Sequence, residues 1–165
     1  MSLLARRPTK TFTVAPEGLW AAVCVDVQDL GLQAGPYGAK HKVRLVWQLD
    51  VFDAEHDRRY DVARVYTLSL HERAALRKDL ESWRGKKFTE KELDGFDLEK
   101  LLGVSAQLQV AQNLSDDGTT YANVLTVLPP TKGTKLIPLN YVRLKDRGVA
   151  HTNGVREEVA NDVPF

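Results

Sequence analysis

The chain has 165 residues, of which 43% are hydrophobic, and its formal net charge is +1. This length and composition allow one large domain, or one domain with tails, built around a hydrophobic core. The near-neutral charge excludes a globally basic protein, so a polyanion could bind only where positive charge is segregated onto one surface. The single cysteine, Cys24, excludes an intramolecular disulfide and indicates a reducing compartment.

The amino-terminal residues 1–13 are polar and basic, with Arg6, Arg7 and Lys10 among them. They contain no apolar run of the length that a signal peptide or a membrane span needs. We therefore expect a flexible arm at this end of the chain. We also expect a soluble, cytoplasmic protein that has no membrane partner.

The first strand is predicted over residues 18–30, where apolar side chains recur at every second position. The run is long for one strand, and a curled strand that serves both halves of a barrel would explain its length. Cys24 lies within it and is expected to be a small buried filler rather than a nucleophile. Glycine and proline mark residues 31–39 as a loop, in which Tyr37 either stacks on a ligand base or pins its own loop.

The most informative stretch is the ribbon 40–66, in which two strand-like runs flank an acidic turn. Cations occupy one face of the first run and apolar residues the other, namely Lys40, Lys42 and Arg44 against Val43, Leu45, Trp47 and Leu49. Cations contact phosphates and rings stack on bases, so this ribbon suits a single nucleic-acid strand. The candidate nucleic-acid-binding residues are Tyr37, Lys40, Lys42, Arg44, Arg58, Arg59, Tyr60, Arg64 and Tyr66.

Two orientations remain open for the second run of this ribbon. In one, Tyr60, Arg64 and Tyr66 face the bound strand. In the other, Tyr66 joins Val62 in the core. A slip of one residue reverses every side chain of a strand, so the local pattern does not choose between them.

Helical signals follow the ribbon. Ser69 and Glu72 form a capping-box pattern and predict a helix over residues 69–84. Leucine and tryptophan at spacings of four and three give this helix one apolar face. Gly85 is a suitable terminator, because glycine readily adopts the left-handed conformation that ends many helices.

A second helical stretch and two more strands complete the predicted domain. Thr89 and Glu92 form another capping box, and residues 97–103 predict one further helical turn. Strands are predicted over 104–112 and 120–128, joined by a turn that contains an Asp-Gly pair. The helical material therefore lies between the third and fourth strands.

From Pro129 the composition changes. Residues 136–144 are apolar enough to pack against the domain or against a second subunit, whereas the chain after Lys145 is polar and is expected to be disordered. The expected organisation is an arm at 1–13, a domain at 14–129, a linker at 130–160 that is partly packed and then disordered, and a terminal tip at 161–165.

The order of elements is three strands, helical material and two strands, which is the order of an OB-fold. This five-stranded Greek-key barrel binds oligonucleotides on the face of its second and third strands, flanked by two loops. In this chain the corresponding parts are the ribbon 40–66 and the loops 31–39 and 113–119. The sequence thus predicts a mainly β protein with one or two helices, an OB-fold and a flexible carboxyl-terminal tail.

Two stretches carry a resemblance to a known family. Asp162, Val163, Pro164 and Phe165 resemble the acidic ending of bacterial and phage single-stranded DNA-binding proteins, which recruits replication and repair partners. The blocks SLHERAALRKDLESWRG and FTEKELDGFDLEKLLG resemble small phage proteins of replication modules. The resemblance implies a phage protein of the host cytoplasm that coats single-stranded DNA during replication or recombination. The ending has one aspartate where the family often has several. This difference bears on how tightly the tip would bind its partner proteins.

Two other functions compete with this interpretation. The first is a protein-interaction module of a replication cluster that does not bind DNA, and the second is a nuclease. Two observations argue against catalysis. The four histidines are not spaced along the sequence as metal ligands are. The sequence also lacks a phosphate-binding glycine motif and a nucleophile elbow. We therefore expect no enzyme activity, cofactor or metal. A homo-oligomer remains open.

The acidic tip predicts a measurable effect on DNA binding. Because Asp162 and its neighbours can occupy the chain's own basic surface, removal of residues 161–165 is expected to tighten DNA binding modestly. Titration of an oligo-dT strand with the full and the shortened chain measures the difference. Unchanged or weaker binding of the shortened chain would count against competition between tail and surface.

Overall fold

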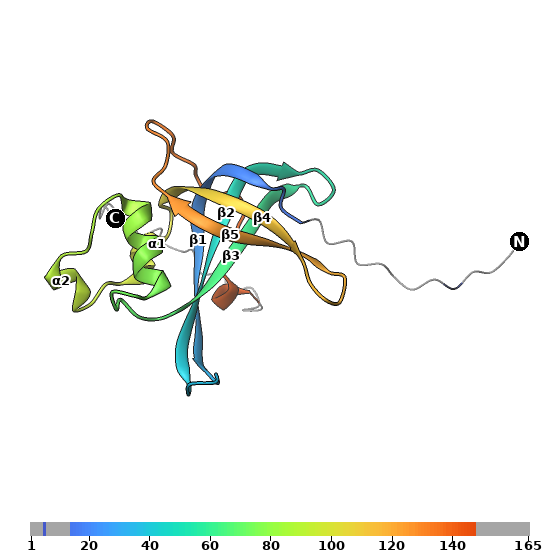
Figure 1. Cartoon of the computed structure of the whole chain (residues 1–165). Coiled ribbons are helices and arrows are strands. Elements are labelled where there is room, and N and C mark those ends of the chain that lie inside the picture. Colours follow the sequence, from blue (N-terminus) through green and yellow to red (C-terminus); the bar gives the residue numbers. More distant parts are fainter. Residues whose placement is uncertain (1–4, 6–13, 148–165) are drawn as a thin grey trace, which may run out of the picture.

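The computed structural model describes residue 5 and residues 14–147, and these form a mainly β structure with two α-helices. Five strands make one antiparallel sheet in the order β3-β2-β1-β4-β5 (Figure 1). The strands are β1 (Gly18–Gln33), β2 (Lys40–Asp53), β3 (Arg58–Thr67), β4 (Ser105–Leu114) and β5 (Thr120–Leu128). The five predicted strands are thus confirmed, with ends that differ by a few residues.

β1 is long because it pairs with two neighbours. Its first half, from Gly18 to Val23, pairs with β4, and its longer second part, from Ala22 to Gln33, pairs with β2. Two register shifts interrupt the β1–β2 ladder, and such shifts bend a strand and increase its twist. β1 therefore pairs along both halves of the sheet, which accounts for its length.

Three helical segments lie between β3 and β4 in the chain, namely α1 (Ala75–Arg84), α2 (Glu90–Leu93) and the 3₁₀ turn η1 (Leu98–Leu101). A further 3₁₀ turn, η2 (Leu144–Asp146), follows β5. The predicted start of α1 at Ser69 is wrong, because the Ser69 hydroxyl accepts a hydrogen bond from the His71 amide and forms a local turn. The predicted stop at Gly85, with φ of 74°, and the Thr89–Glu92 capping box are confirmed. Within the described residues, no helix is long and apolar enough to cross a membrane.

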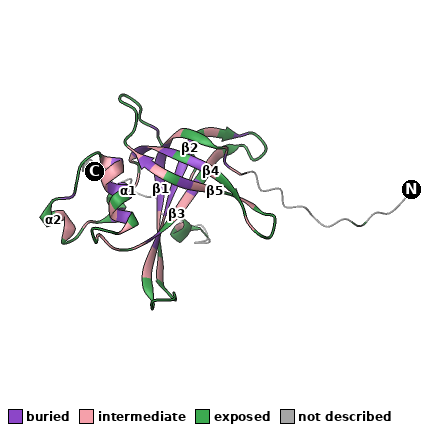
Figure 2. Ribbon diagram, in the orientation of Figure 1, coloured by how far each residue is buried: buried purple, intermediate pink, exposed green. Residues whose placement is uncertain are grey.

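The hydrophobic core fills the space between the sheet and α1, where buried residues gather in Figure 2. Trp47 of β2 and Trp83 of α1 are fully buried, with ring centroids 5.9 Å apart. Trp47 is therefore a core residue, as its parity with Val43 and Leu45 predicted. Cys24 is also fully buried, and burial raises the pKa of its thiol to about 12, which keeps it protonated and unreactive at neutral pH.

The orientation of β3 is the second of the two that the sequence left open. Val62 and Tyr66 are buried in the core, whereas Val65 is exposed. The β2–β3 register places Tyr66 opposite Val43 and Val65 opposite Arg44. Residues opposite each other in an antiparallel pair share a face, so Arg44 and Val65 lie on the outer face of the sheet.

Residues 136–147, which we call the strap, cross the outer face of β1, β2 and β3. Leu136 packs with Val23, Val25 and Val46, and Tyr141 packs against the same cluster. The segment therefore packs against its own domain, the first of the two alternatives that its apolar residues allowed.

Candidate nucleic-acid interface

The outer face of β2 carries three cations next to the β1–β2 hairpin. Lys40, Lys42 and Arg44 occupy alternate positions of one strand and so point to the same side. Lys42 lies opposite Gly31, which has no side chain. We call Tyr37, Lys40, Lys42 and Arg44 together the hairpin patch.

Among the described residues, the charges of the hairpin patch have no ionic partner. Lys42 Nζ donates to the Thr67 hydroxyl at 2.7 Å, and Arg44 Nη1 donates to the Gln28 amide oxygen at 3.3 Å. Both acceptors are uncharged, and within residues 14–147 no carboxylate lies at ion-pair distance from Lys40, Lys42 or Arg44. The acceptors orient the two cations and leave their charge free to attract a phosphate.

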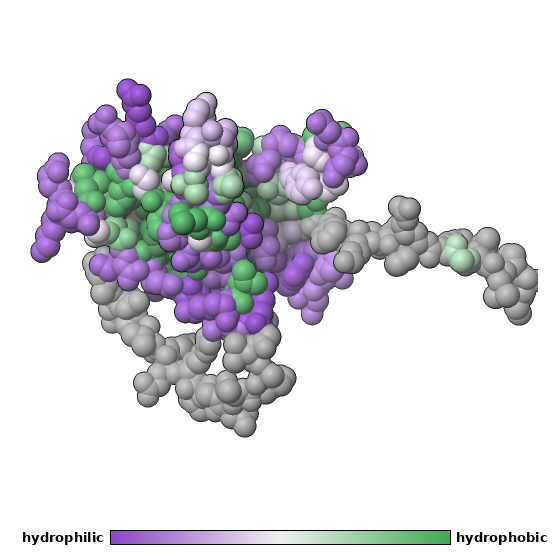
Figure 3. All heavy atoms as spheres, turned by 90° about the horizontal axis from the view of Figure 1, so that it is seen from below, coloured by the Kyte–Doolittle hydropathy of each residue, from purple (hydrophilic) through white to green (hydrophobic). Residues whose placement is uncertain are grey.

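Tyr37 completes the patch from the hairpin loop. Its side chain is 91% exposed, so it does not pin the loop by packing against the core. A hollow of about 120 Å³ lies beside it, lined by loop residues together with Lys40 and Lys42. An exposed ring next to two cations is suited to stack on a base while the cations contact neighbouring phosphates. From the side of this hairpin the molecular surface is mainly hydrophilic, with small hydrophobic groups between (Figure 3).

Three candidates of β3 lie on the core side of the sheet and are separate from the hairpin patch. Tyr66 is 2% exposed and donates its hydroxyl proton to Asp79 of α1 at 2.6 Å, so its ring is not accessible to a base. Arg64 donates to the same carboxylate at 2.8 Å. Tyr60 is half-buried against the core. We therefore correct the expected roles of these three residues: they join β3 to α1 and to the core.

Arg58 and Arg59 lie at the opposite end of β2 from the hairpin patch. They pair with Asp53 and Phe52 next to the β2–β3 turn. Arg59 Nη1 donates to the Ile137 carbonyl at 2.6 Å, so this guanidinium supports the strap. The candidate cations on β2 and at the start of β3 thus form two separate groups.

The strap separates these two groups because it is fixed to the middle of the face. The Gln48 amide donates to the Leu139 carbonyl at 2.7 Å and accepts from the Leu139 amide at 2.8 Å. Further along, the Asp26 carboxylate accepts from the Tyr141 hydroxyl and from Arg143 Nε, each at 3.0 Å. Sequence reasoning found the apolar residues of the strap but missed these polar anchors.

Asp26 is the most buried of the anchors, with 1% of its surface exposed. Burial alone would raise the pKa of its carboxyl. Hydrogen bonds from the Leu144 amide, Gln28, Arg143 and Tyr141 outweigh this effect and hold the pKa below its ordinary value. Asp26 is therefore ionised at neutral pH and balances the charge of Arg143.

The β2–β3 turn brings Asp53, Glu55 and His56 together, with ligand atoms within 4.8 Å of one another. His56 Nδ1 lies 2.8 Å from one Asp53 oxygen, and the other oxygen accepts from the Glu55 amide. These bonds are those of an Asx turn, in which an aspartate organises the loop that follows it. The cluster is accounted for by the turn, and we assign no metal to it.

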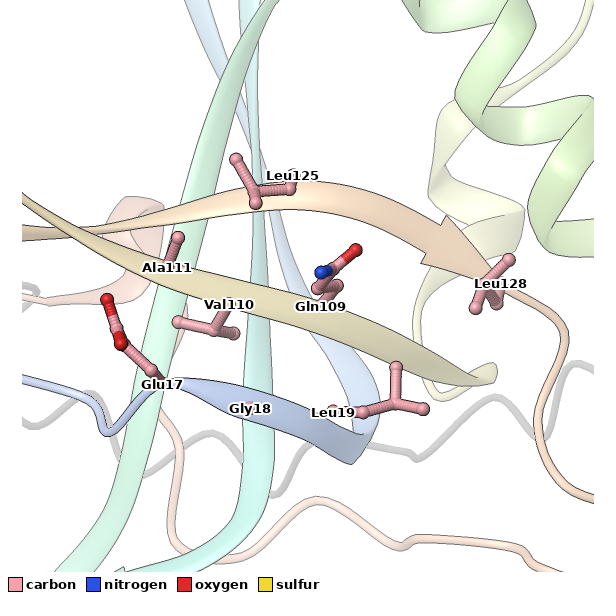
Figure 4. A pocket seen from close by; sticks show the side chains of 8 residues that line it. All are labelled: Glu17, Gly18, Leu19, Gln109, Val110, Ala111, Leu125 and Leu128. Carbon is pink, nitrogen blue, oxygen red and sulfur yellow. The ribbon is translucent and has the colours of Figure 1, made fainter.

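A second concave surface lies on the outside of β1, β4 and β5. This groove has a volume of about 530 Å³ and is lined by Leu19, Leu125 and Leu128 among others (Figure 4). Of the described residues that line it, Glu17 alone is charged. A groove without cations does not suit a nucleic-acid backbone, and the hairpin patch remains the candidate for that role.

No protein-family model matches the chain, and no curated protein matches it significantly. The remaining sequence candidates, Asp162, Val163, Pro164 and Phe165, lie outside the described residues.

Proposed function

We propose that the protein is a sequence-tolerant single-stranded DNA-binding protein without enzyme activity, and that it binds DNA with the hairpin patch. The observation that carries the proposal is the gathering of Lys40, Lys42 and Arg44 on one face, with uncharged hydrogen-bond acceptors and an exposed tyrosine ring beside them. Cations and stacking rings bind a single strand without reading its bases, because every nucleotide has a phosphate and a flat base.

The proposed fold is an OB-fold. Three features support it: the sheet order β3-β2-β1-β4-β5, the pairing of β1 with both β2 and β4, and the helical segments between β3 and β4. The edge strands β3 and β5 also lie close together, as closure of a barrel requires. In such a barrel the outer face of β2 and β3 is the usual surface for oligonucleotides.

A salt titration tests the proposed function. Fluorescence titration with poly-dT at several salt concentrations is expected to give binding that weakens steeply with salt. The affinities for poly-dT and for a mixed-sequence strand are expected to be similar, because stacking and phosphate contacts carry little base preference. Binding that is absent or insensitive to salt would contradict the proposal.

Recruitment of replication or recombination proteins by Asp162–Phe165 is a further part of the proposal. It rests on the family resemblance of these residues alone. The same resemblance supports a phage protein that acts in the host cytoplasm.

The alternative function is a protein-interaction module without DNA binding of its own. The groove on β1, β4 and β5 favours it, because Leu19 and Leu125 are exposed there and the described lining residues include no cation. A pull-down of partners that survives nuclease treatment, from a protein with no affinity for DNA, would support this alternative over the first proposal.

A further inference from the structure

The strap carries large apolar side chains on the face that it turns away from the domain. Leu136 and Tyr141 point inward and pack with the cluster of valines on β1 and β2. Four other apolar residues of the strap are each between 43% and 69% exposed. We call these four residues the apolar row: Ile137, Leu139, Val142 and Leu144.

The inward face of the strap is fixed, and this holds the apolar row at the surface. Arg143 bonds to both Asp26 and Glu99, and Gln48 bonds to the backbone amide and carbonyl of Leu139. Asn140 has a φ of 52°, in the left-handed region that asparagine adopts more readily than most residues. The alternation changes phase there, so odd-numbered residues face outward before Asn140 and even-numbered residues face outward after it.

Phe52 of β2 extends the apolar row beyond Ile137. It lies opposite Arg59 in the β2–β3 ladder, and Arg59 Nη1 donates to the Ile137 carbonyl at 2.6 Å. The Phe52 side chain is itself 52% exposed. Single exposed apolar side chains are normal on a protein surface, but several on adjoining segments form the kind of patch that marks an interaction site.

The chemistry of the apolar row suits a protein partner better than DNA. The four side chains of the row are aliphatic, whereas base stacking uses rings. A carboxylate also lies at its edge, because Asp61 is opposite Gln48, the residue that binds Leu139. A carboxylate at this position repels the phosphates of a nucleic acid and the headgroups of an anionic membrane.

Charges of both signs border the row, and this favours a second copy of the same chain. Asp61 interacts electrostatically with Arg58 and Arg147. Within residues 14–147 none of these three side chains forms an ion pair. A two-fold contact places the same patch on both sides, so a border of one sign would repel itself. This border can instead bring Asp61 of one copy near an arginine of the other, around an apolar centre.

We propose that the apolar row, together with Phe52, is the contact surface of a homodimer, in which two copies of this chain pack their straps against each other around a two-fold axis. One face of the strap then packs on its own domain and the opposite face packs on the second copy. This inference does not depend on the proposed DNA binding, and the poly-dT titration leaves it unaffected.

Glutamate substitutions on the row test the dimer. Analytical ultracentrifugation of the unmodified protein, from micromolar to near-millimolar concentrations, is expected to show a dimer. Ile137→Glu combined with Val142→Glu is expected to weaken dimerisation roughly 100-fold, because the symmetry brings the new charges of both copies together. Leu19→Glu combined with Leu125→Glu is the matched control. Both leucines are about as exposed, but they line the groove on β1, β4 and β5, so this variant is expected to remain a dimer.

A disulfide crosslink gives a second measurement that does not rely on disrupting the surface. Leu139 lies within the row, and a two-fold contact brings it near its own copy. Mild oxidation of Leu139→Cys is therefore expected to give a covalent dimer, seen on a non-reducing gel. Cys24 is fully buried and contributes no background. Leu125→Cys, on the groove, is expected to stay uncrosslinked under the same conditions.

Three results would overturn the proposed dimer. The first is an unmodified protein that is monomeric at every concentration. The second is a dimer that the groove variant dissociates and the row variant does not. The third is crosslinking of Leu125→Cys that is as fast as that of Leu139→Cys. Circular dichroism spectra that match the unmodified protein would show that the row variant is folded and that its dissociation reports on the contact.

Discussion

The double substitution of Lys42 and Arg44 by alanine is expected to remove most of the affinity for single-stranded DNA. Each phosphate neutralised on a single strand contributes about 0.7 to the slope of log Kobs against log salt, so the slope should become shallower by about 1.4. The loss should be largest at low salt, where counterion release contributes most. Fluorescence titration with poly-dT at four or more salt concentrations gives both the affinity and the slope.

A matched control shows whether DNA binding depends on where these two charges lie or only on the net charge of the protein. Lys86 and Lys87 follow α1 and are exposed, so their double alanine variant has the same net charge as the Lys42–Arg44 variant. It should bind poly-dT as the unmodified protein does. Within residues 14–147 the side chains of Lys42 and Arg44 bond to the uncharged groups of Thr67 and Gln28, so the fold should tolerate their loss. An unchanged salt slope in the Lys42–Arg44 variant would rule out the hairpin patch.

The sequence alone predicted the five strands and which face of β2 is buried. The apolar positions Val43, Leu45, Trp47 and Leu49 recur with a period of two, and such a pattern has only one good orientation against a core. All four are buried. The cations that alternate with them therefore lie on the outer face, as the pattern predicted.

β3 was ambiguous because its core side carries polar residues. Arg64 and Tyr66 share a face with Val62 and are joined by Asp79, a residue of α1. Burial and the neighbouring Asp79 carboxylate raise the pKa of the Tyr66 hydroxyl above its ordinary value, so it remains a hydrogen-bond donor. The partner that makes this arrangement stable lies 13 residues from Tyr66, beyond the range of a strand pattern.

The division of the outer face could not be seen in the sequence for a similar reason. Gln48 and Asp26 look like ordinary exposed residues of alternating strands, yet both are buried. Gln48 is covered by Leu139, 91 residues away, and Asp26 by Arg143, 117 residues away. A buried polar residue needs a partner to offset its desolvation, and only the folded chain shows which segment supplies it.

The largest effect on stability is expected for Asp26→Ala. This change removes the acceptor for the Tyr141 hydroxyl, for Arg143 Nε and for the Leu144 amide at 2.9 Å. Breaking a buried ion pair by removing one partner costs about 3–5 kcal/mol. Because Arg143 keeps its ion pair with Glu99, the loss is expected near the lower end of this range. Urea denaturation at pH 7 should show this loss in the free energy of unfolding. Asp26→Asn, which keeps the size and one oxygen acceptor, should lose less.

The pH dependence of the same variant identifies the carboxylate charge as the cause. Hydrogen bonds lower the pKa of Asp26 in the folded protein below the ordinary value of 3.8. Its contribution to stability is therefore fully present above pH 3.8 and is lost as the pH falls through the folded-state pKa. The difference in unfolding free energy between the unmodified protein and Asp26→Ala should shrink progressively below pH 3.8. An equally large difference at pH 7 and at pH 2 would mean that Asp26 holds the strap by packing and not by its charge.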